Sequence, residues 1–440
     1  MSLLVPVMLF GWVPLTVLLF FRIKPHHAAL VCVIGGMLFL PMTGYSFSGF
    51  PDYSKETAIA LGLILGGRLS GKGQEFPLKI QLYDMLMIAW CLCPIASSLT
   101  NNLGIYDGLS SSLAQSLKWG VPYFAGRKYF CDKESLKDLL LALLIGGLLY
   151  APLCLYEVRM SPQLSNIIYG FFPHSWVQHL RYGGYRPIVF MQHGLMVSLW
   201  IAIAATAALW CWRSQLITNV KGIPTSALFI LLTITCFFCK SANGFFAFTV
   251  GCVLLKQPKL IYLTLLSIPC YLVLRMNNVI TIDDLTTFTH QYLDTERVDS
   301  LAIRLLQEDL FYQRALEQPF FGWGGYDRGK PIDPHTGQPI KIMIDSLWII
   351  TMRSRGFVGL ITLFSAMLIG PWLWLQKVRK YKKDDPENDF LPQVLLSLIV
   401  VLFMIDSLLN GMINSVYILI SGALLGTYLK SDRLMPEPKE

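Results

Sequence analysis

The sequence predicts an all-α polytopic membrane protein with about 12 to 13 transmembrane helices. Of its 440 residues, 54% are hydrophobic and only 15% are charged, whereas soluble proteins carry about 25% charged residues. The hydrophobic residues form blocks of about 17 to 25, the length that crosses a bilayer as an α-helix. A β-barrel would alternate polar and apolar residues instead. These observations exclude soluble enzymes, disordered chains, secreted disulfide scaffolds and membrane barrels.

Thirteen hydrophobic stretches are predicted to cross the membrane. Most are separated by short polar connections, as expected for helices that pack side by side. The stretches are 3–21, 28–44, 56–69, 83–100, 107–126, 136–156, 188–212, 223–240, 242–257, 259–275, 346–376, 390–407 and 412–429.

Two of these stretches are irregular. The stretch 56–69 is short and contains three glycines, so we expect a tilted or broken helix. The stretch 346–376 is too long for one straight helix, and its first third contains Arg353 and Arg355. We therefore expect it to begin at the membrane interface and to enter the membrane near Gly356.

The distribution of Lys and Arg predicts the orientation. Alternate connections and the C-terminal tail together carry 21 basic residues, whereas the opposite short connections carry only Lys55 and Lys240. Because connections rich in Lys and Arg stay in the cytoplasm, the N-terminus is predicted to lie outside and the C-terminus inside.

Two long connections, both predicted on the outer side, divide the chain. Long ordered connections in a compact protein are usually functional. The resulting segments are N-terminal helices at 1–156, a first outer loop at 157–187, central helices at 188–275, a large outer loop at 276–345, C-terminal helices at 346–430 and a cytoplasmic tail at 431–440.

The stretch 299–318 in the large outer loop is predicted to form an amphipathic helix, because its apolar residues recur at helical spacing. Asp299 or Ser300 is a suitable cap for its start. Arg304 and Glu308 are four residues apart and could form an ion pair on one face. We expect this helix to lie flat on the outer membrane surface and to cover a cavity.

The basic residues of the outer loops and their membrane edges are ten Arg and only two Lys. Arg binds phosphate or carboxylate with a planar, permanently charged fork, so the set predicts an outer cavity for a phosphate or diphosphate. The alternative is that each Arg pairs with one of the nearby acids. The basic residues are Arg159, Arg181, Arg186, Arg275, Arg297, Arg304, Arg314, Arg328, Arg353, Arg355, Lys330 and Lys341.

Histidine and cysteine patterns give no prediction of a metal site. Five histidines lie on the outer side, but none are paired at the spacing of helical metal ligands; they are His174, His179, His193, His290 and His335. His335 lies in a turn-like sequence and is either a solvated loop residue or a general base. None of the ten cysteines lies in the long outer loops, so we interpret them as packing residues.

The sequence Arg186-Pro187-Ile188-Val189-Phe190-Met191-Gln192-His193-Gly194-Leu195 leads into an apolar stretch. It is similar to the Arg-x-x-Gly-x-Phe-x-x-Pro-Asn pattern of the bacterial O-antigen ligase and polymerase family, and further motifs resemble those of that family in the same order. Further along the chain the similar motifs are Lys240-Ser241-Ala242-Asn243-Gly244, Ser300 to Arg304, Pro319 with Gly322-Trp323-Gly324, Asp345-Ser346, Gly356-Phe357-Val358-Gly359, and Asp406 with Asn410. The resemblance covers about 185–430.

The resemblance implies a glycosyltransferase of the GT-C type at the periplasmic face of the bacterial inner membrane. Its donor would be an undecaprenyl-diphosphate-linked oligosaccharide, and its acceptor a glycan or lipid A core. Other polysaccharide assembly or export proteins are candidate partners, and nucleic acid is not. Arg186 and Arg304 match the arginines that hold the lipid diphosphate. Asp345 replaces the ligase histidine, and Ala242-Asn243 replaces Ser-Arg, which are departures from the ligase pattern.

The residues support such chemistry without a metal or cofactor. Fixed Arg side chains, with Arg181 and Arg314 added to the two matched ones, would stabilise the diphosphate leaving group. Asp345 or His335 would take the proton of the acceptor hydroxyl, and direct attack would invert the anomeric carbon. Trp323, Tyr326 and His193 would contact sugars; for the two aromatic residues, anchoring at the membrane interface is the alternative.

A flippase or exporter of lipid-linked polysaccharide is the alternative function, and a non-catalytic scaffold is a third. A transporter places charges near the middle of its spans on discontinuous helices. Here the charges gather in the outer loops, so the sequence favours the enzyme.

Overall fold

The computed structural model describes residues 2–434, apart from 48, 73–77, 182, 256, 282–283, 285–286, 288–294, 334, 341, 343 and 382–389. Predicted positions such as His290 and Lys341, and residues 435–440 of the tail, therefore lie outside the described residues. The described chain is mostly helical, and its strands form only two-residue antiparallel pairs. Among the described residues, five helices are long and apolar enough to cross a membrane. The predicted class, an all-α membrane protein, agrees with this structure.

Each of the thirteen predicted stretches contains helix. The five long apolar helices are α1, α8, α10, α13 and the first 34 residues of α16. The helices are α1 (Leu4–Arg22), α2 (Pro25–Leu30), η1 (Val31–Gly35), α3 (Gly36–Phe39), α4 (Lys55–Leu69), α5 (Asp84–Thr100), α6 (Ile105–Gln115), η2 (Ser116–Gly120), α7 (Val121–Tyr129), α8 (Lys133–Met160), α9 (Leu164–Tyr169), η3 (Trp176–His179), α10 (Gly194–Ser214), α11 (Thr225–Phe238), α12 (Ala242–Val253), α13 (Pro258–Met276), α15 (Thr295–Ala315), α16 (Leu347–Tyr381), α17 (Leu391–Asp406) and α18 (Ser415–Leu434).

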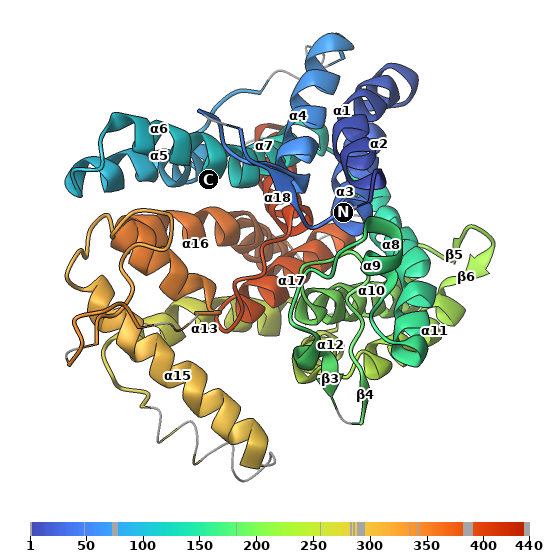
Figure 1. Cartoon of the computed structure of the whole chain (residues 1–440). Helices are drawn as coiled ribbons and strands as arrows, with labels where there is room; N and C mark the ends of the chain where they lie inside the picture. Colours follow the sequence, from blue (N-terminus) through green and yellow to red (C-terminus); the bar gives the residue numbers. More distant parts are fainter. Residues whose placement is uncertain are drawn as a thin grey trace.

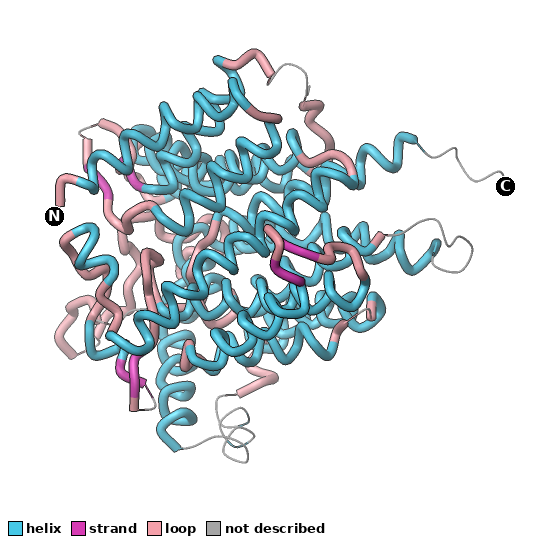
Figure 2. Tube along the Cα trace, turned by 90° about the vertical axis from the view of Figure 1, so that its right-hand side faces the viewer, coloured by secondary structure: helices cyan, strands magenta, loops and turns pink. Residues whose placement is uncertain are grey.

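Three hairpins connect some of these helices. Strands β1 (Gly44–Tyr45) and β2 (Tyr53–Ser54) pair, as do β3 (Leu180–Arg181) with β4 (Gly184–Tyr185) and β5 (Asn219–Val220) with β6 (Ile223–Pro224). Figure 2 shows the start of α1 and the end of α18 at opposite ends of the helix bundle. The predicted orientation, with the N-terminus outside and the C-terminus inside, stays a prediction.

The core of the bundle surrounds α10 and α17. Almost every residue of α10 is buried, and the helix packs against α8, α11, α12 and α17. A helix that is hydrophobic on all sides belongs inside a larger assembly of helices. By contrast, α15 packs on α16 and extends away from the bundle (Figure 1).

The three glycines of α4 serve close packing. A Cβ atom at Gly66 would lie 2.4 Å from the Phe20 ring of α1, and one at Gly62 would lie 3.1 Å from Thr16. Small residues allow helix backbones to approach in this way. The helix is continuous from Lys55 to Leu69, so of the two predicted alternatives, a tilted or a broken helix, the broken one was wrong.

Helix α16 breaks at Gly356, whose φ of 63° is not helical. The loop after α15 fills the break: the Phe357 N–H donates to the Pro319 carbonyl at 2.7 Å, and the Trp323 N–H donates to the Arg353 carbonyl at 2.8 Å. These contacts satisfy backbone groups that a break would otherwise leave unpaired. The irregularity predicted near Gly356 is thus confirmed, and two of the sequence motifs meet there.

Some predicted boundaries were wrong. Helix α10 begins at Gly194 rather than near 188, and α15 begins at Thr295, so neither Asp299 nor Ser300 caps its start. Helix α15 ends at Ala315, before Pro319. The last helix continues to Leu434, so the predicted tail boundary at 431 falls within α18.

Candidate active site

The segment that follows Arg186 is buried but not helical, and one acid holds it in place. Glu157, near the end of α8, accepts hydrogen bonds from the Ile188 and Val189 N–H groups at 2.8 Å each and from the Leu164 N–H at 2.9 Å. Irregular backbone at such depth requires internal partners. The Glu157 carboxylate therefore fixes the backbone beside the buried Arg186 side chain.

Lys55 supports the same segment from another helix. Its ammonium is buried at the start of α4 and donates to the Met37 carbonyl at 3.0 Å and to the Phe190 carbonyl at 3.5 Å. The Tyr150 hydroxyl accepts from the Phe190 N–H at 3.1 Å. Two helices, α4 and α8, thus contribute polar groups that replace the helical hydrogen bonds missing before Gly194.

Three histidines gather beside Arg186. The ring centroid of His193 lies 4.7 Å from that of His174 and 5.7 Å from that of His179. Burial and then the nearby Arg186 charge lower the pKa of His179 to about 4 and that of His193 to about 3. Both imidazoles are therefore neutral near pH 7.

The tautomer of His193 follows from its hydrogen bonds. Nδ1 accepts the Leu195 N–H at 3.1 Å, which caps the start of α10, so the ring proton sits on Nε2. Nε2 then donates to Gln178 Oε1 at 3.3 Å. His193 thus has a structural role in the described chain, in addition to its predicted role in sugar binding.

Arg304, on α15, faces the chain just before α16. Its Nη2 lies 3.7 Å from Asp345 Oδ2, and the two side chains are 37% and 46% exposed. Arg304 also lies close enough to His193 and to the buried Asp406 to act on both electrostatically. The long and solvated pair leaves Arg304 available to a stronger anion.

Asp406 closes the other side of this group at the end of α17. Asn410 Nδ2 donates to Asp406 Oδ1 at 2.8 Å, and the Asn243 amide lies near the same carboxylate. We call Arg186, His193, Arg304, Asp345 and Asp406 the outer site. Its members come from the segment before α10, from α15, from the segment just before α16 and from the end of α17.

The four predicted diphosphate-binding arginines do not converge. Arg314 lies ten residues after Arg304 on α15, about 15 Å along the helix axis. Its guanidinium stacks on the Trp323 ring with 4.1 Å to the centroid, and it pairs with Glu317. Arg181 lies on β3 with its side chain exposed. The structure therefore groups Arg304 with Arg186 and separates Arg314 from them.

The remaining predicted site residues also lie apart from the outer site. Trp323 donates its Nε1–H to the Arg314 carbonyl at 2.8 Å, while Tyr326 is 71% exposed. His335 lies on an exposed turn, where its N–H donates to Asp333 Oδ1 at 2.9 Å. The structure thus agrees with the alternative that His335 is a solvated loop residue. Among the described residues, no contact brings His335 near Arg304.

Arg353 and Arg355 line a cavity of about 530 Å³, and Tyr326 is part of its wall. Arg328 lies close enough to Arg355 to act on it electrostatically and completes a second arginine group. Its charges follow the ion-pair alternative: Arg328 pairs with Asp107 at 3.0 Å, and Arg353 pairs with Asp327 at 3.6 Å. Elsewhere Arg275 pairs with Asp309 at 2.7 Å. For these arginines the alternative that each pairs with a nearby acid is confirmed.

Glu308 is a buried acid, whereas the sequence analysis gave it as a possible ion-pair partner of Arg304. It is 3% exposed and points inward toward Ser346 and Trp348 rather than to Arg304. Burial raises the pKa of its carboxyl to about 7, against the opposing effects of Ser346 and Arg275. The signal was available, because Glu308 is three residues from both Leu305 and Phe311 on the buried face of α15.

The search of the sequence for metal-ligand spacing did not find a cluster of His26, His27 and Asp138 at the opposite end of the bundle. The Nε2 atoms of His26 and His27 lie 3.0 Å and 2.9 Å from Asp138 Oδ2. Their ligand atoms are mutually close enough to hold a metal ion. Two adjacent histidines and a distant acid have no characteristic spacing, so only the fold brings them together.

Comparison with known protein families and with curated proteins finds no match to this chain.

Proposed function

We propose that this protein is a periplasmic-face membrane glycosyltransferase of the O-antigen ligase and polymerase type, which transfers glycan from an undecaprenyl-diphosphate carrier. The observation that carries the proposal is the approach of Arg304 to Asp345 beside Arg186 and His193. Arg186 and His193 belong to one of the motifs that resemble the family, and Arg304 and Asp345 belong to two others that are distant from it in sequence.

Arg304 and Arg186 bind the donor diphosphate in this proposal. Arg186 is almost fully buried, and Glu157 fixes the backbone two and three residues after it, so little reorganisation accompanies the reaction. Fixed positive charge in a partly dry site stabilises a leaving diphosphate much more than exposed charge does. His179 and His193 are neutral near pH 7, so the positive charge that faces the diphosphate comes from the two arginines.

Asp345 acts as the base for the acceptor hydroxyl. It is half-exposed, so an acceptor can reach it, and its contact with Arg304 is long. The acceptor oxygen attacks the anomeric carbon as the carbon–oxygen bond to the diphosphate breaks. The bonding electrons leave with the diphosphate, the hydroxyl proton moves to Asp345, and the configuration inverts.

The position of the buried charges favours an enzyme over a flippase. Lys55 and Asp84 are the first residues of α4 and α5, and Asp406 is the last residue of α17. Asp84 pairs with Arg127 near the end of α7, with Arg127 Nε 2.9 Å from Asp84 Oδ1. Transporters instead concentrate such groups near the middle of interrupted spans.

The test uses purified protein and an undecaprenyl-diphosphate oligosaccharide in the presence of a metal chelator. Asp345→Asn should bind the donor normally and lose at least about 100-fold in transfer rate, because it removes the base. Asp327→Asn is the matched control, since Asp327 pairs with Arg353 outside the outer site, and it should retain activity.

The products identify the reaction. A ladder of lengthening glycans indicates a polymerase, and a single block on lipid A core indicates a ligase. If the unmodified protein bound the donor without turnover and moved it across liposome membranes, the protein would be a flippase rather than an enzyme.

A further inference from the structure

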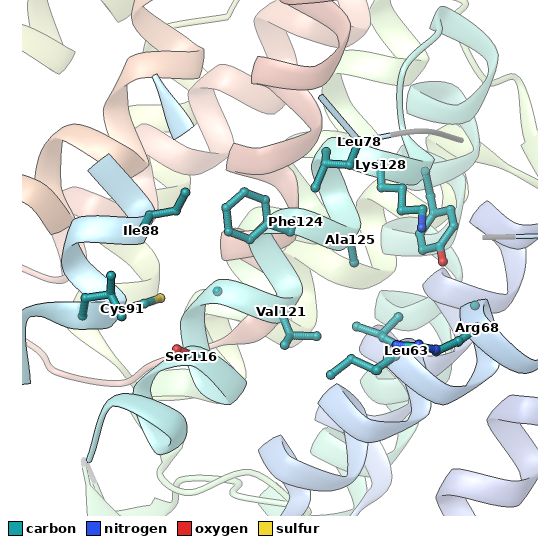
Figure 3. Close-up of a pocket in the computed structure, with 15 residues that line it drawn as sticks. Leu63, Arg68, Leu78, Ile88, Cys91, Ser116, Val121, Phe124, Ala125 and Lys128 are labelled. Carbon is teal, nitrogen blue, oxygen red and sulfur yellow. The ribbon is translucent and has the colours of Figure 1, made fainter. Parts of the chain in front are cut away.

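A cavity of about 720 Å³ lies between α4, α5, η2 and α7, far from the outer site. Figure 3 shows its lining, which is mostly apolar and includes Leu63, Ile88, Val121 and Phe124. Ile64 and Leu92 also line the cavity and have exposed side chains. In a membrane protein, exposed apolar residues on helices face lipid, so the cavity opens toward the acyl chains of the bilayer.

Two cations lie together on one side of this cavity. Arg68 is in the last turn of α4 and Lys128 in the last turn of α7. In Figure 3 both lie on the right, whereas Cys91 and Ser116 lie on the left. The cavity therefore has a charged end and an uncharged end.

Neither cation is neutralised by an acid among the described residues. The adjacent residue shows the contrast, because Arg127 is buried and held by Asp84 with two hydrogen bonds of 2.9 Å. Lys128 is half-buried, and its ammonium lies 5.5 Å from the centroid of the Tyr129 ring. Arg68 is exposed at the cavity mouth. An anion is the missing complement to this pair.

The charged end lies on the side opposite to the outer site. Helix α4 begins at Lys55, which contacts the carbonyl of Phe190, four residues after Arg186 in the chain. Arg68 is thirteen residues further along this helix, about 20 Å away. Its neighbours in sequence, Lys72 and Lys79, are among the basic residues that predict the cytoplasmic side.

We propose that this cavity binds an anionic glycerophospholipid of the cytoplasmic leaflet. The phosphate contacts Arg68 and Lys128, and an acyl chain lies along Leu63, Val121 and Phe124. Basic pockets between membrane helices on the cytoplasmic side are suited to such headgroups. A zwitterionic lipid fits less well, because its own ammonium compensates the phosphate that the two cations would bind. The site is separate from the proposed transfer reaction.

The test measures phosphatidylglycerol and phosphatidylcholine binding to the full-length protein in detergent, by native mass spectrometry and by the lipid-dependent rise in melting temperature. The unmodified protein should prefer phosphatidylglycerol. The double variant Arg68→Gln/Lys128→Gln should weaken phosphatidylglycerol binding roughly thirtyfold. A matched control, Lys24→Gln/Lys221→Gln, removes two exposed charges predicted on the same side and should bind as the unmodified protein does.

The apolar end needs its own variant. Leu92→Trp fills space at an exposed lining position and should weaken phosphatidylglycerol binding while both cations remain. Three results would overturn the proposal: equal binding of phosphatidylcholine, full binding by the double variant, or displacement of the lipid by millimolar inorganic phosphate. The last would show that the cations bind a free anion rather than a lipid.

Discussion

The two ends of the bundle each place two cations beside one another, but in different surroundings. At the outer site, Arg186 is buried and the chain after it is fixed by the Glu157 carboxylate. At the opposite end, Arg68 is exposed, and Arg68 and Lys128 border an apolar cavity. Fixed charge suits stabilisation of a transition state, whereas mobile charge suits attraction of a headgroup.

The choice of cation differs in the same sense. The outer site uses two arginines, whose planar forks bind phosphate oxygens in fixed directions. The charged end of the cavity, called the basic end below, uses one arginine and one lysine, Arg68 and Lys128. The outer site also contains an acid, Asp345, at 3.7 Å from Arg304. A site for chemistry needs a proton acceptor, and a site for a lipid headgroup does not.

The largest expected effect is the loss of activity in Arg304→Lys. The substitution keeps the charge but removes the bidentate fork, so we expect transfer to fall by about 100- to 1,000-fold, the range typical for loss of one oxyanion contact. Initial rates of glycan transfer measure it. Arg314→Lys is the control, because Arg314 packs on Trp323. Full activity of Arg304→Lys would remove the distinction between the two ends.

Glu308→Gln tests a second difference, the buried acid beneath the outer site. Burial raises the pKa of Glu308 in the folded protein to about 7 from 4.5, so the folded state binds the proton more tightly. Stability should therefore fall as pH rises from 4.5 to 7, by about 3 kcal/mol from this group, and stay level above 7.

The amide of Glu308→Gln cannot ionise, so the variant should lose this slope and exceed the unmodified protein in stability at pH 8. Thermal unfolding in detergent between pH 4.5 and 8 measures the difference. The groups that face Glu308 are Arg275 and Asp309 with Ser346 and Trp348. If the melting temperatures of the two proteins changed with pH in parallel, the burial of Glu308 would not contribute to the pH dependence of stability.

Much of the fold was predictable from the sequence. Long apolar stretches can satisfy their backbone only as helices in a membrane, which is why each of the thirteen stretches contains helix. The break at Gly356 was also predictable, because two arginines precede it in an apolar stretch. The start of α10 was not predictable, since residues 188–190 are apolar and yet form their hydrogen bonds with Glu157, Tyr150 and Lys55.

The candidate site was predictable only in part. Motif order grouped Arg186, Arg304 and Asp345, and the structure brings Arg304 to Asp345. Composition grouped Arg314 with them, although ten residues of one helix separate it from Arg304. The group of His26, His27 and Asp138 and the cavity with Arg68 depend on contacts between segments that are distant in the sequence, and no spacing encodes such contacts.

Glu157→Gln tests whether the segment that Glu157 fixes holds Arg186 in place. The amide keeps an acceptor oxygen but loses the charge-assisted bonds to the Ile188 and Val189 N–H groups, a loss of about 2 kcal/mol. We expect lower thermal stability together with a reduced transfer rate. Glu134→Gln, at an exposed acid in the first turn of the same helix, should change neither. Unchanged transfer in Glu157→Gln would show that Arg186 needs no such support.

The smallest effect is expected for Arg68→Lys at the basic end. If the cation attracts a headgroup through charge alone, lysine replaces arginine with less than about a threefold change in phosphatidylglycerol affinity, because each basic residue contributes only about 1 kcal/mol near a membrane surface. Lipid titration by native mass spectrometry measures it. A loss as large as that of Arg68→Gln would instead indicate a directional, bidentate contact, and would make the basic end resemble the outer site in its dependence on the guanidinium fork.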